Sequence, residues 1–92
     1  MAKPRTSRRR DAFRSDARAA PELRSALTRL GLRIRALREK RGVTQEGLAD
    51  LAKLDAKHVQ LIEAGKTNTT VASLAGIAAG LKLPLKDLFE GV

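Results

Sequence analysis

The side chains of this sequence that could take part in chemistry are mainly cations. The chain of 92 residues has 19 Lys and Arg against 10 Asp and Glu, which gives a net charge of +9 at pH 7. Cys is absent and His58 is the single histidine, which excludes thiolate metal sites, thiol nucleophiles and a histidine cluster around a metal. No acid–base pair or activated nucleophile is evident either. We therefore expect a protein that is not an enzyme, uses no cofactor or metal, and binds a polyanion.

The composition narrows the kind of polyanion. Phe13 and Phe89 are the only aromatic residues. Proteins that recognise single-stranded nucleic acid stack its bases against aromatic side chains, so the composition argues against a single-stranded partner. No apolar run reaches the roughly 18 residues that a membrane-spanning helix needs, so we expect no membrane-spanning segment. Charge alone does not separate DNA from RNA or from an anionic membrane surface.

The positive charge is concentrated at the front of the chain. All twelve Arg lie at or before position 41, whereas residues 42–92 are close to neutral. Residues 1–20 show no periodic apolar pattern, which predicts a flexible basic arm ahead of a folded domain at 21–92. A solvated tail that only aids solubility is the alternative. The arm contains three candidates for contacts with DNA phosphates or the minor groove: Arg8, Arg9 and Arg10.

Apolar periodicity predicts a long first helix in the folded part. Pro21 and Glu22 suit the first turn of a helix, and Gly42 suits a left-handed residue just after its end. Between them, one apolar stripe recurs at steps of three and four residues. Its members are Leu23, Leu27, Leu30, Ile34 and Leu37.

Capping residues predict two short helices after the first. Thr44 is expected to cap a helix of about eight residues. A turn of three or four residues then leads to a second N-cap at Asp55, and a helix at 56–64 ends at Gly65.

The remaining residues predict two more helices. Thr70 is expected to cap a fourth helix, and Pro84 to open a short fifth one. No segment alternates with the period of two that is typical of a strand, so the predicted fold is all-α with four or five helices. The fourth helix has apolar residues at helical spacing: Val71, Leu74, Ile77, Ala78 and Leu81.

Two short helices joined by a tight turn, the second of them amphipathic, form a helix-turn-helix, whose second helix can enter the major groove of DNA. Here the residues resemble the phage-repressor and Cro-like helix-turn-helix family, called the XRE family. Three motifs carry the resemblance, which covers about residues 30–90. They are Thr-Gln-Glu-Gly-Leu-Ala at 44–49, Ile-Glu-Ala-Gly-Lys at 62–66 and Leu-Pro-Leu-Lys-Asp-Leu-Phe at 83–89.

The resemblance implies a five-helix, repressor-like domain, here with a basic arm and a first helix that is extended upstream. It also implies a cytoplasmic, nucleoid-associated regulator of transcription that binds double-stranded DNA as a homodimer on a near-palindromic operator. The second motif helix would contact bases through four residues: Ala56, Lys57, Gln60 and Leu61. Phosphates would be contacted near the start of each motif helix and in the loop after the second, by Thr44, Gln45, His58, Lys66, Thr67 and Asn68.

Further roles follow from the same resemblance. Arg38 and Glu63 match residues that form a partly buried ion pair between the first and third helices, with two solvated charges as the alternative. His58 is expected to be an exposed residue near a phosphate, not a ligand or a base. Four apolar residues near the C-terminal end could belong either to the core or to a dimer interface: Leu85, Leu88, Phe89 and Val92.

Four positions depart from the family pattern. Lys53 stands where the family often has glycine, and a left-handed residue there would cost roughly 1 kcal/mol. Gly47 replaces an acidic residue or Ala, and Asp55 stands where Ser or Thr is commoner. Lys57 is the one cation of the second motif helix. These departures weaken the expected DNA affinity and leave the expected fold unchanged.

Three functions are compatible with the sequence. The leading hypothesis is a sequence-specific regulator, similar to restriction–modification controllers and phage repressors. The second is an antitoxin or another interaction protein whose main partner is a protein gripped by the basic arm or by residues 21–30. The third is non-specific compaction of nucleic acid through the arm alone.

Overall fold

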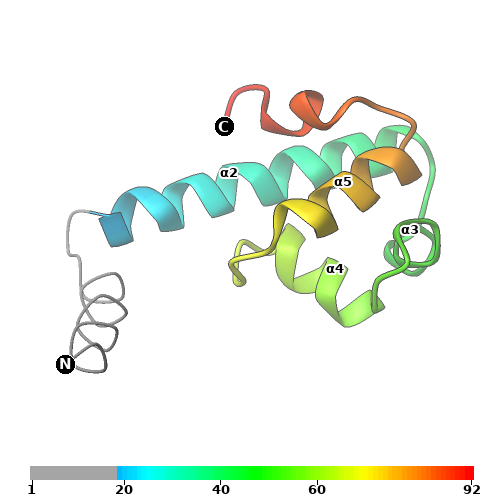
Figure 1. The fold of residues 1–92 in the computed structure, drawn as a ribbon, viewed down its shortest axis with the longest axis horizontal. Coiled ribbons are helices and arrows are strands. Elements are labelled where there is room, and N and C mark those ends of the chain that lie inside the picture. The colour runs from blue at the N-terminus through cyan, green and yellow to red at the C-terminus, as the bar shows by residue number, and fades with distance from the viewer. Residues whose placement is uncertain (1–18) are drawn as a thin grey trace, which may run out of the picture.

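The computed structural model describes residues 19–92, so the predicted arm lies outside the described residues, apart from its last two positions. Within the described part, the chain forms four α-helices and one 3₁₀ helix and has no strand (Figure 1). The predicted all-helical class is confirmed, and the predicted count of five α-helices is wrong. The elements are α2 (Ala19–Lys40), α3 (Gln45–Ala52), α4 (Ala56–Glu63), α5 (Val71–Gly80) and the 3₁₀ helix η1 (Leu85–Phe89).

The expected fifth helix is the 3₁₀ helix η1. Pro84 precedes it with extended backbone angles, as an N-cap residue does. The Asp87 N–H donates to the Pro84 carbonyl at 3.0 Å, which is the three-residue spacing of a 3₁₀ turn. Only five residues separate Pro84 from the turn at Glu90, and so short a segment favours the tighter helix.

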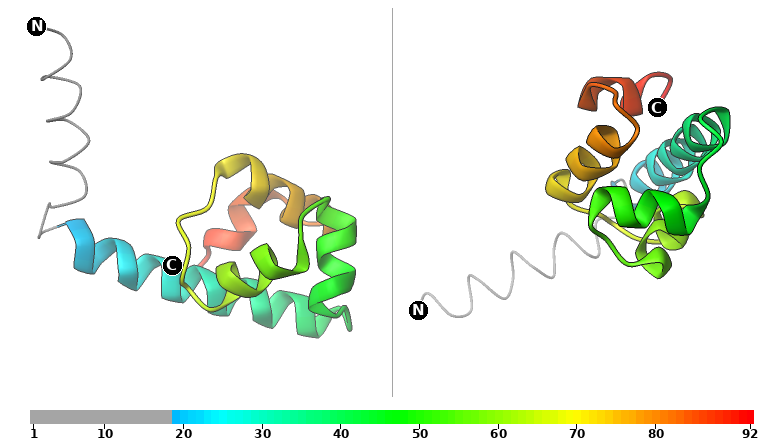
Figure 2. Two further views of the ribbon diagram at one scale, coloured as in Figure 1. Left: turned by 90° about the horizontal axis from the view of Figure 1, so that it is seen from below. Right: turned by 90° about the vertical axis from the view of Figure 1, so that its right-hand side faces the viewer.

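Helix α2 is the spine of the domain. It begins at Ala19, two residues before the predicted start at Pro21, and ends at Lys40. Gly42 follows with φ of +69°, as its role at the helix end predicts. Figures 1 and 2 show the first turns of α2 extending past the other elements of the described part.

The other elements pack around the second half of α2. Helix α4 and η1 both pack against α2, while α3 packs against α4 and α5 at one end of the domain (Figure 2). Two residues of the predicted apolar stripes are exposed: Val71, at 66%, in the first turn of α5, and Leu23, at 36%, in the first half of α2. The largest fully buried side chains are Ile34, Leu48, Val59, Ile77, Leu81 and Leu88.

Two glycines bring α2 and α4 into close contact. Gly31 lies in the unbroken helix α2, and a Cβ there would be 2.5 Å from the carbonyl oxygens of Ile62 and Glu63. Gly65, which follows α4 with φ of +69°, leaves no room for a Cβ beside Thr28. Small residues at these two positions therefore set how closely α4 lies on α2, and with it how α4 is presented.

Candidate nucleic-acid interface

The turn between α3 and α4 is tight and left-handed. Lys53 has φ of 60° and ψ of 45°, the conformation expected there if this position replaces the family's glycine. The Leu54 N–H donates to the Ala49 carbonyl at 2.9 Å, and the Lys53 N–H donates to the Asp50 carbonyl at 3.3 Å. These bonds close the end of α3 in the six-to-one pattern that accompanies a left-handed residue. They fix the direction in which the chain enters α4.

The two motif helices begin differently. Thr44 Oγ1 accepts a hydrogen bond from the Gly47 N–H at 2.9 Å, so the predicted cap is present and Gly47 does not disrupt it. Asp55 occupies the N-cap position of α4, as predicted, but makes no side-chain capping bond. The backbone N–H groups of the first turn of α4 therefore receive no capping bond from the Asp55 carboxylate. They can donate hydrogen bonds to an acceptor on a bound molecule.

Helix α4 has one buried side and one open side. Val59, Ile62 and Glu63 are buried. Lys57 and Gln60 are exposed, three residues apart and therefore on one face of the helix. The other two predicted base contacts, Ala56 and Leu61, are half-buried, and Ala56 packs against the core. Of the four candidates, Lys57 and Gln60 are the most accessible to a bound molecule.

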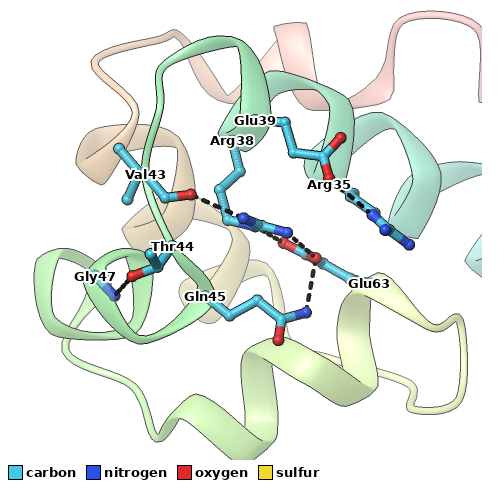
Figure 3. A network of polar contacts seen from close by, with 8 residues as sticks. All are labelled: Arg35, Arg38, Glu39, Val43, Thr44, Gln45, Gly47 and Glu63. Atoms are coloured by element: carbon cyan, nitrogen blue, oxygen red, sulfur yellow. Dashed lines mark hydrogen bonds and ion pairs between the residues drawn. The ribbon is translucent and has the colours of Figure 1, made fainter.

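A polar network joins three elements behind the open side of α4 (Figure 3). Arg38 Nε donates to Glu63 Oε2 at 2.6 Å and Arg38 Nη2 to Glu63 Oε1 at 3.0 Å, a bidentate pair between α2 and α4. Arg38 Nη1 also donates to the Val43 carbonyl at 2.8 Å. Arg38 and Glu63 are 9% and 6% exposed, so the pair lies in the interior. Its main effect is to fix the position of the helices, because burial of two charges offsets much of their attraction.

The same network holds Gln45 at the start of α3. Gln45 Nε2 donates to Glu63 Oε1 at 3.0 Å, which leaves its second amide hydrogen and its carbonyl oxygen for other partners. The Glu63 carboxylate accepts from Arg38 and raises the pKa of that guanidinium above its ordinary value. The sequence predicted a phosphate contact for Gln45 but not its bond to Glu63, for which no local signal exists.

His58 lies differently from the prediction. It is half-buried rather than exposed, and its Nε2 lies 3.3 Å from Thr69 Oγ1 in the loop after α4. The predicted exposure failed because Thr69, eleven residues later, folds back against α4. His58 therefore connects α4 to the loop that follows it.

The loop after α4 presents polar groups beside the open side of that helix. Lys66 and Asn68 are exposed and Thr67 is half-buried. The Lys66 N–H donates to the Leu61 carbonyl at 2.9 Å, which holds the first residue of the loop against the end of α4. The structure thus brings the predicted phosphate-contacting loop next to the predicted base-contacting helix.

The four apolar C-terminal residues do not share one environment. Leu88 is fully buried and belongs to the core, so it offers no surface to a second subunit. Leu85 and Val92 are half-buried against the core. Phe89 is 43% exposed. Two hydrogen bonds that the sequence did not predict hold the C-terminal segment to α2. Arg33 Nε donates to the Asp87 carbonyl at 3.0 Å, and Arg33 Nη2 donates to Glu90 Oε1 at 2.9 Å.

The described part of the chain contains neither a candidate metal site nor a candidate membrane-spanning helix. Within residues 19–92, no group of His, Asp and Glu side chains could hold a metal ion. None of the described helices is both long enough and apolar enough to cross a membrane.

Sequence comparison places this geometry among known proteins. The family model of the helix-turn-helix domain matches residues 29–89. The control protein C.MunI of a Mycoplasma species is 37% identical over 65 residues, which cover 70% of this chain and 88% of that protein. The HTH-type transcriptional regulator DdrOP3 of Deinococcus deserti is 32% identical over 60 residues. That match covers 65% of this chain but only 46% of DdrOP3, so this chain spans less than half of that regulator's length.

Solved structures have the same arrangement of helices. The restriction-modification controller protein C.AhdI from Aeromonas hydrophila matches with a TM-score of 0.70 at 34% identity, over 71% of this chain and 98% of that chain. An HTH_3 family transcriptional regulator from Vibrio cholerae matches with a TM-score of 0.71 at 25% identity, over 75% of this chain and 39% of that chain.

Proposed function

The chain belongs to the helix-turn-helix domain family, and from that premise we propose that it is a sequence-specific regulator of transcription that binds operator DNA as a homodimer. The observation that carries the proposal is the open side of α4. Lys57 and Gln60 are exposed there, while the opposite side of the same helix is buried against α2 and α3. A short helix presented in this way fits the major groove of double-stranded DNA.

The open side of α4 has suitable chemistry for contacts with bases. The Lys57 ammonium can donate to guanine O6 and N7, and the Gln60 amide can pair with adenine N6 and N7. Ala56 and Leu61 offer apolar surface to a thymine methyl group. These four residues are the proposed base contacts.

Contacts with phosphates would surround this helix. Thr44 and Gln45 lie at the start of α3, where free N–H groups and the helix dipole favour an anion. Lys66, Thr67 and Asn68 would hold the next stretch of backbone. His58 would act indirectly, since its ring contacts Thr69. The arm residues Arg8, Arg9 and Arg10, outside the described residues, would add affinity that depends little on base sequence.

The size of α4 supports the proposed dimer. Its eight residues span about 12 Å, so a single copy can contact only a few base pairs. A two-fold pair would place two such helices about 34 Å apart, one turn of DNA, on a near-palindromic site. Phe89, with Leu85 and Val92 beside it, offers apolar surface for the second copy. Leu88 is left out of this interface.

Two controller proteins match this chain over most of their own length. The matched region covers 98% of the C.AhdI chain and 88% of C.MunI. We therefore propose that this protein, a DNA-bound cytoplasmic regulator, controls genes beside its own in the manner of a restriction–modification controller.

Selection of bound sequences from a random duplex library tests the proposal. We expect enrichment of a near-palindrome with half-sites one helical turn apart, protection of such a site near the protein's own gene, and a dimer by sedimentation. Equal affinity for every duplex at fixed salt would instead indicate non-specific compaction. A protein that binds no duplex and co-purifies with a stoichiometric protein partner would indicate the interaction-protein alternative.

A further inference from the structure

The first half of α2 is an extension whose role the proposed function does not explain. Residues 19–27, here called the α2 extension, run past the rest of the described domain (Figures 1 and 2). The extension carries exposed Arg24 near its middle. Among residues 19–92, core burial of α2 starts at Leu30, which is 6% exposed, so packing within this described part does not account for the earlier turns.

The loop after α4 rests directly beside the α2 extension. A Cβ at Gly65 would lie 2.9 Å from Thr28 Cα and 3.2 Å from the Leu27 carbonyl oxygen. Lys66, the exposed cation of this loop, is the next residue. The surface formed by α4 and its loop therefore continues onto α2 at Thr28.

Helical spacing places Arg24 on that same surface. Arg24 precedes Thr28 by four residues and Gly31 by seven, and residues at these spacings share one face of a helix. Gly31 and Thr28 are the points at which α2 meets α4 and its loop. The four residues from Arg24 to Thr28 correspond to about 6 Å along the helix axis. Arg24 therefore lies roughly one turn before the point where the Lys66 loop meets α2, on the side of α2 that faces away from η1.

Arg24 also differs from the other arginines of α2 around it. Arg35, on the same side of the helix, pairs with Glu39 at 3.2 Å. Arg29 donates to Ser25 Oγ at 2.8 Å, and five residues place it about 140° around the helix from Arg24. Arg33 faces η1, where it contacts Asp87 and Glu90. Arg24 and Lys66 are thus neighbouring exposed cations on one continuous surface.

We propose that Arg24 binds a DNA backbone phosphate next to those bound by the Lys66 loop, so that the α2 extension forms part of the DNA interface. This inference rests on the proposed function and adds a contact outside the helix-turn-helix itself. A guanidinium suits the task because its planar array of donors matches two phosphate oxygens. The contact would add affinity without base preference, since the phosphate backbone is the same at every step.

The test compares Arg24→Gln with Arg29→Gln in the full chain. Both residues are exposed on the same helix and both changes remove one charge. The slope of log affinity against log salt is measured for each variant on the selected operator and on an unrelated duplex. For Arg24→Gln we expect the slope to fall by about 0.9 on both duplexes, with several-fold weaker binding and unchanged base preference. For Arg29→Gln we expect the wild-type slope.

Two other outcomes would overturn the inference. Equal slopes for the two variants would show that the general charge of α2 acts, not a contact of Arg24. A weaker dimer with an unchanged slope for Arg24→Gln would assign the α2 extension to contacts between protein chains. If the wild type shows no preference for any sequence, the proposed regulator function fails, but a lower slope for Arg24→Gln on any duplex still supports the phosphate contact.

Discussion

On α4, the buried and the open sides follow different physical requirements. Val59 and Ile62 fill the core, and Glu63 pairs with Arg38 of α2. On the open side, Lys57 and Gln60 have no packing requirement to meet. The comparison shows that one set of side chains holds this eight-residue helix in place while another set stays exposed for the proposed contacts with DNA. Changes on the buried side should therefore alter stability, and changes on the open side should alter binding.

The largest expected effect is on the buried side. Glu63→Ala leaves the Arg38 guanidinium buried without its carboxylate, which should lower the free energy of unfolding by about 3–5 kcal/mol. Urea denaturation measures the change. Glu39→Ala is the matched control, because it removes the partner of Arg35 at an exposed pair and should cost no more than about 1 kcal/mol. Similar losses of unfolding free energy for both variants would mean that burial of the Arg38–Glu63 pair does not increase the cost of removing its carboxylate.

The open side is tested by Lys57→Ala. Loss of one base contact should weaken binding to the best site by about 1–3 kcal/mol and relax the preference at one base position. The free energy of unfolding should stay within about 0.5 kcal/mol of the wild type. Lys86→Ala, an exposed lysine on η1, serves as the control and should leave base preference intact. A Lys57→Ala variant with unchanged preference would remove Lys57 from the base contacts.

A smaller effect is expected at the turn that orients both sides. Lys53 holds a left-handed conformation, which costs a residue with a Cβ about 1–2 kcal/mol. Lys53→Gly should therefore raise the free energy of unfolding by about 1 kcal/mol after glycine's larger entropy loss, measured by urea denaturation. Lys82, with φ of 58°, offers a second test in which the same substitution should act in the same direction. A loss of stability in both variants would contradict the argument from backbone strain.

Local sequence signals were sufficient to predict most of the elements that position α4. The apolar stripe of the first helix and the caps at Thr44 and Thr70 each depend on residues within a few positions of one another. The left-handed conformation at Lys53 was expected only through the family resemblance, in which glycine often stands there. The role of Gly31 could not be predicted in this way, because by helix propensity alone a glycine destabilises the helix that contains it. Its role became visible only when α4 was placed against it.

The details of the candidate site depended on tertiary contacts that local patterns do not contain. The contact of His58 with Thr69 and the bond of Gln45 to Glu63 join residues 11 and 18 positions apart. Leu88 and Phe89 are adjacent and apolar, and only packing against α2 and α5 decides which one is buried. The sequence could therefore predict that α4 is amphipathic, but not which partners its neighbours would have.

Amide chemical shifts of the ¹⁵N-labelled protein, recorded as the selected operator duplex is added, test the central claim most directly. We expect the largest changes at Lys57 and Gln60 on the open side of α4, with further changes at Gln45 and Lys66. The solvent-exposed residues of α5, such as Ala72 and Ala75, should shift little. Large changes along α5 with α4 unaffected would contradict the account, because DNA would then be bound by a different face of the domain.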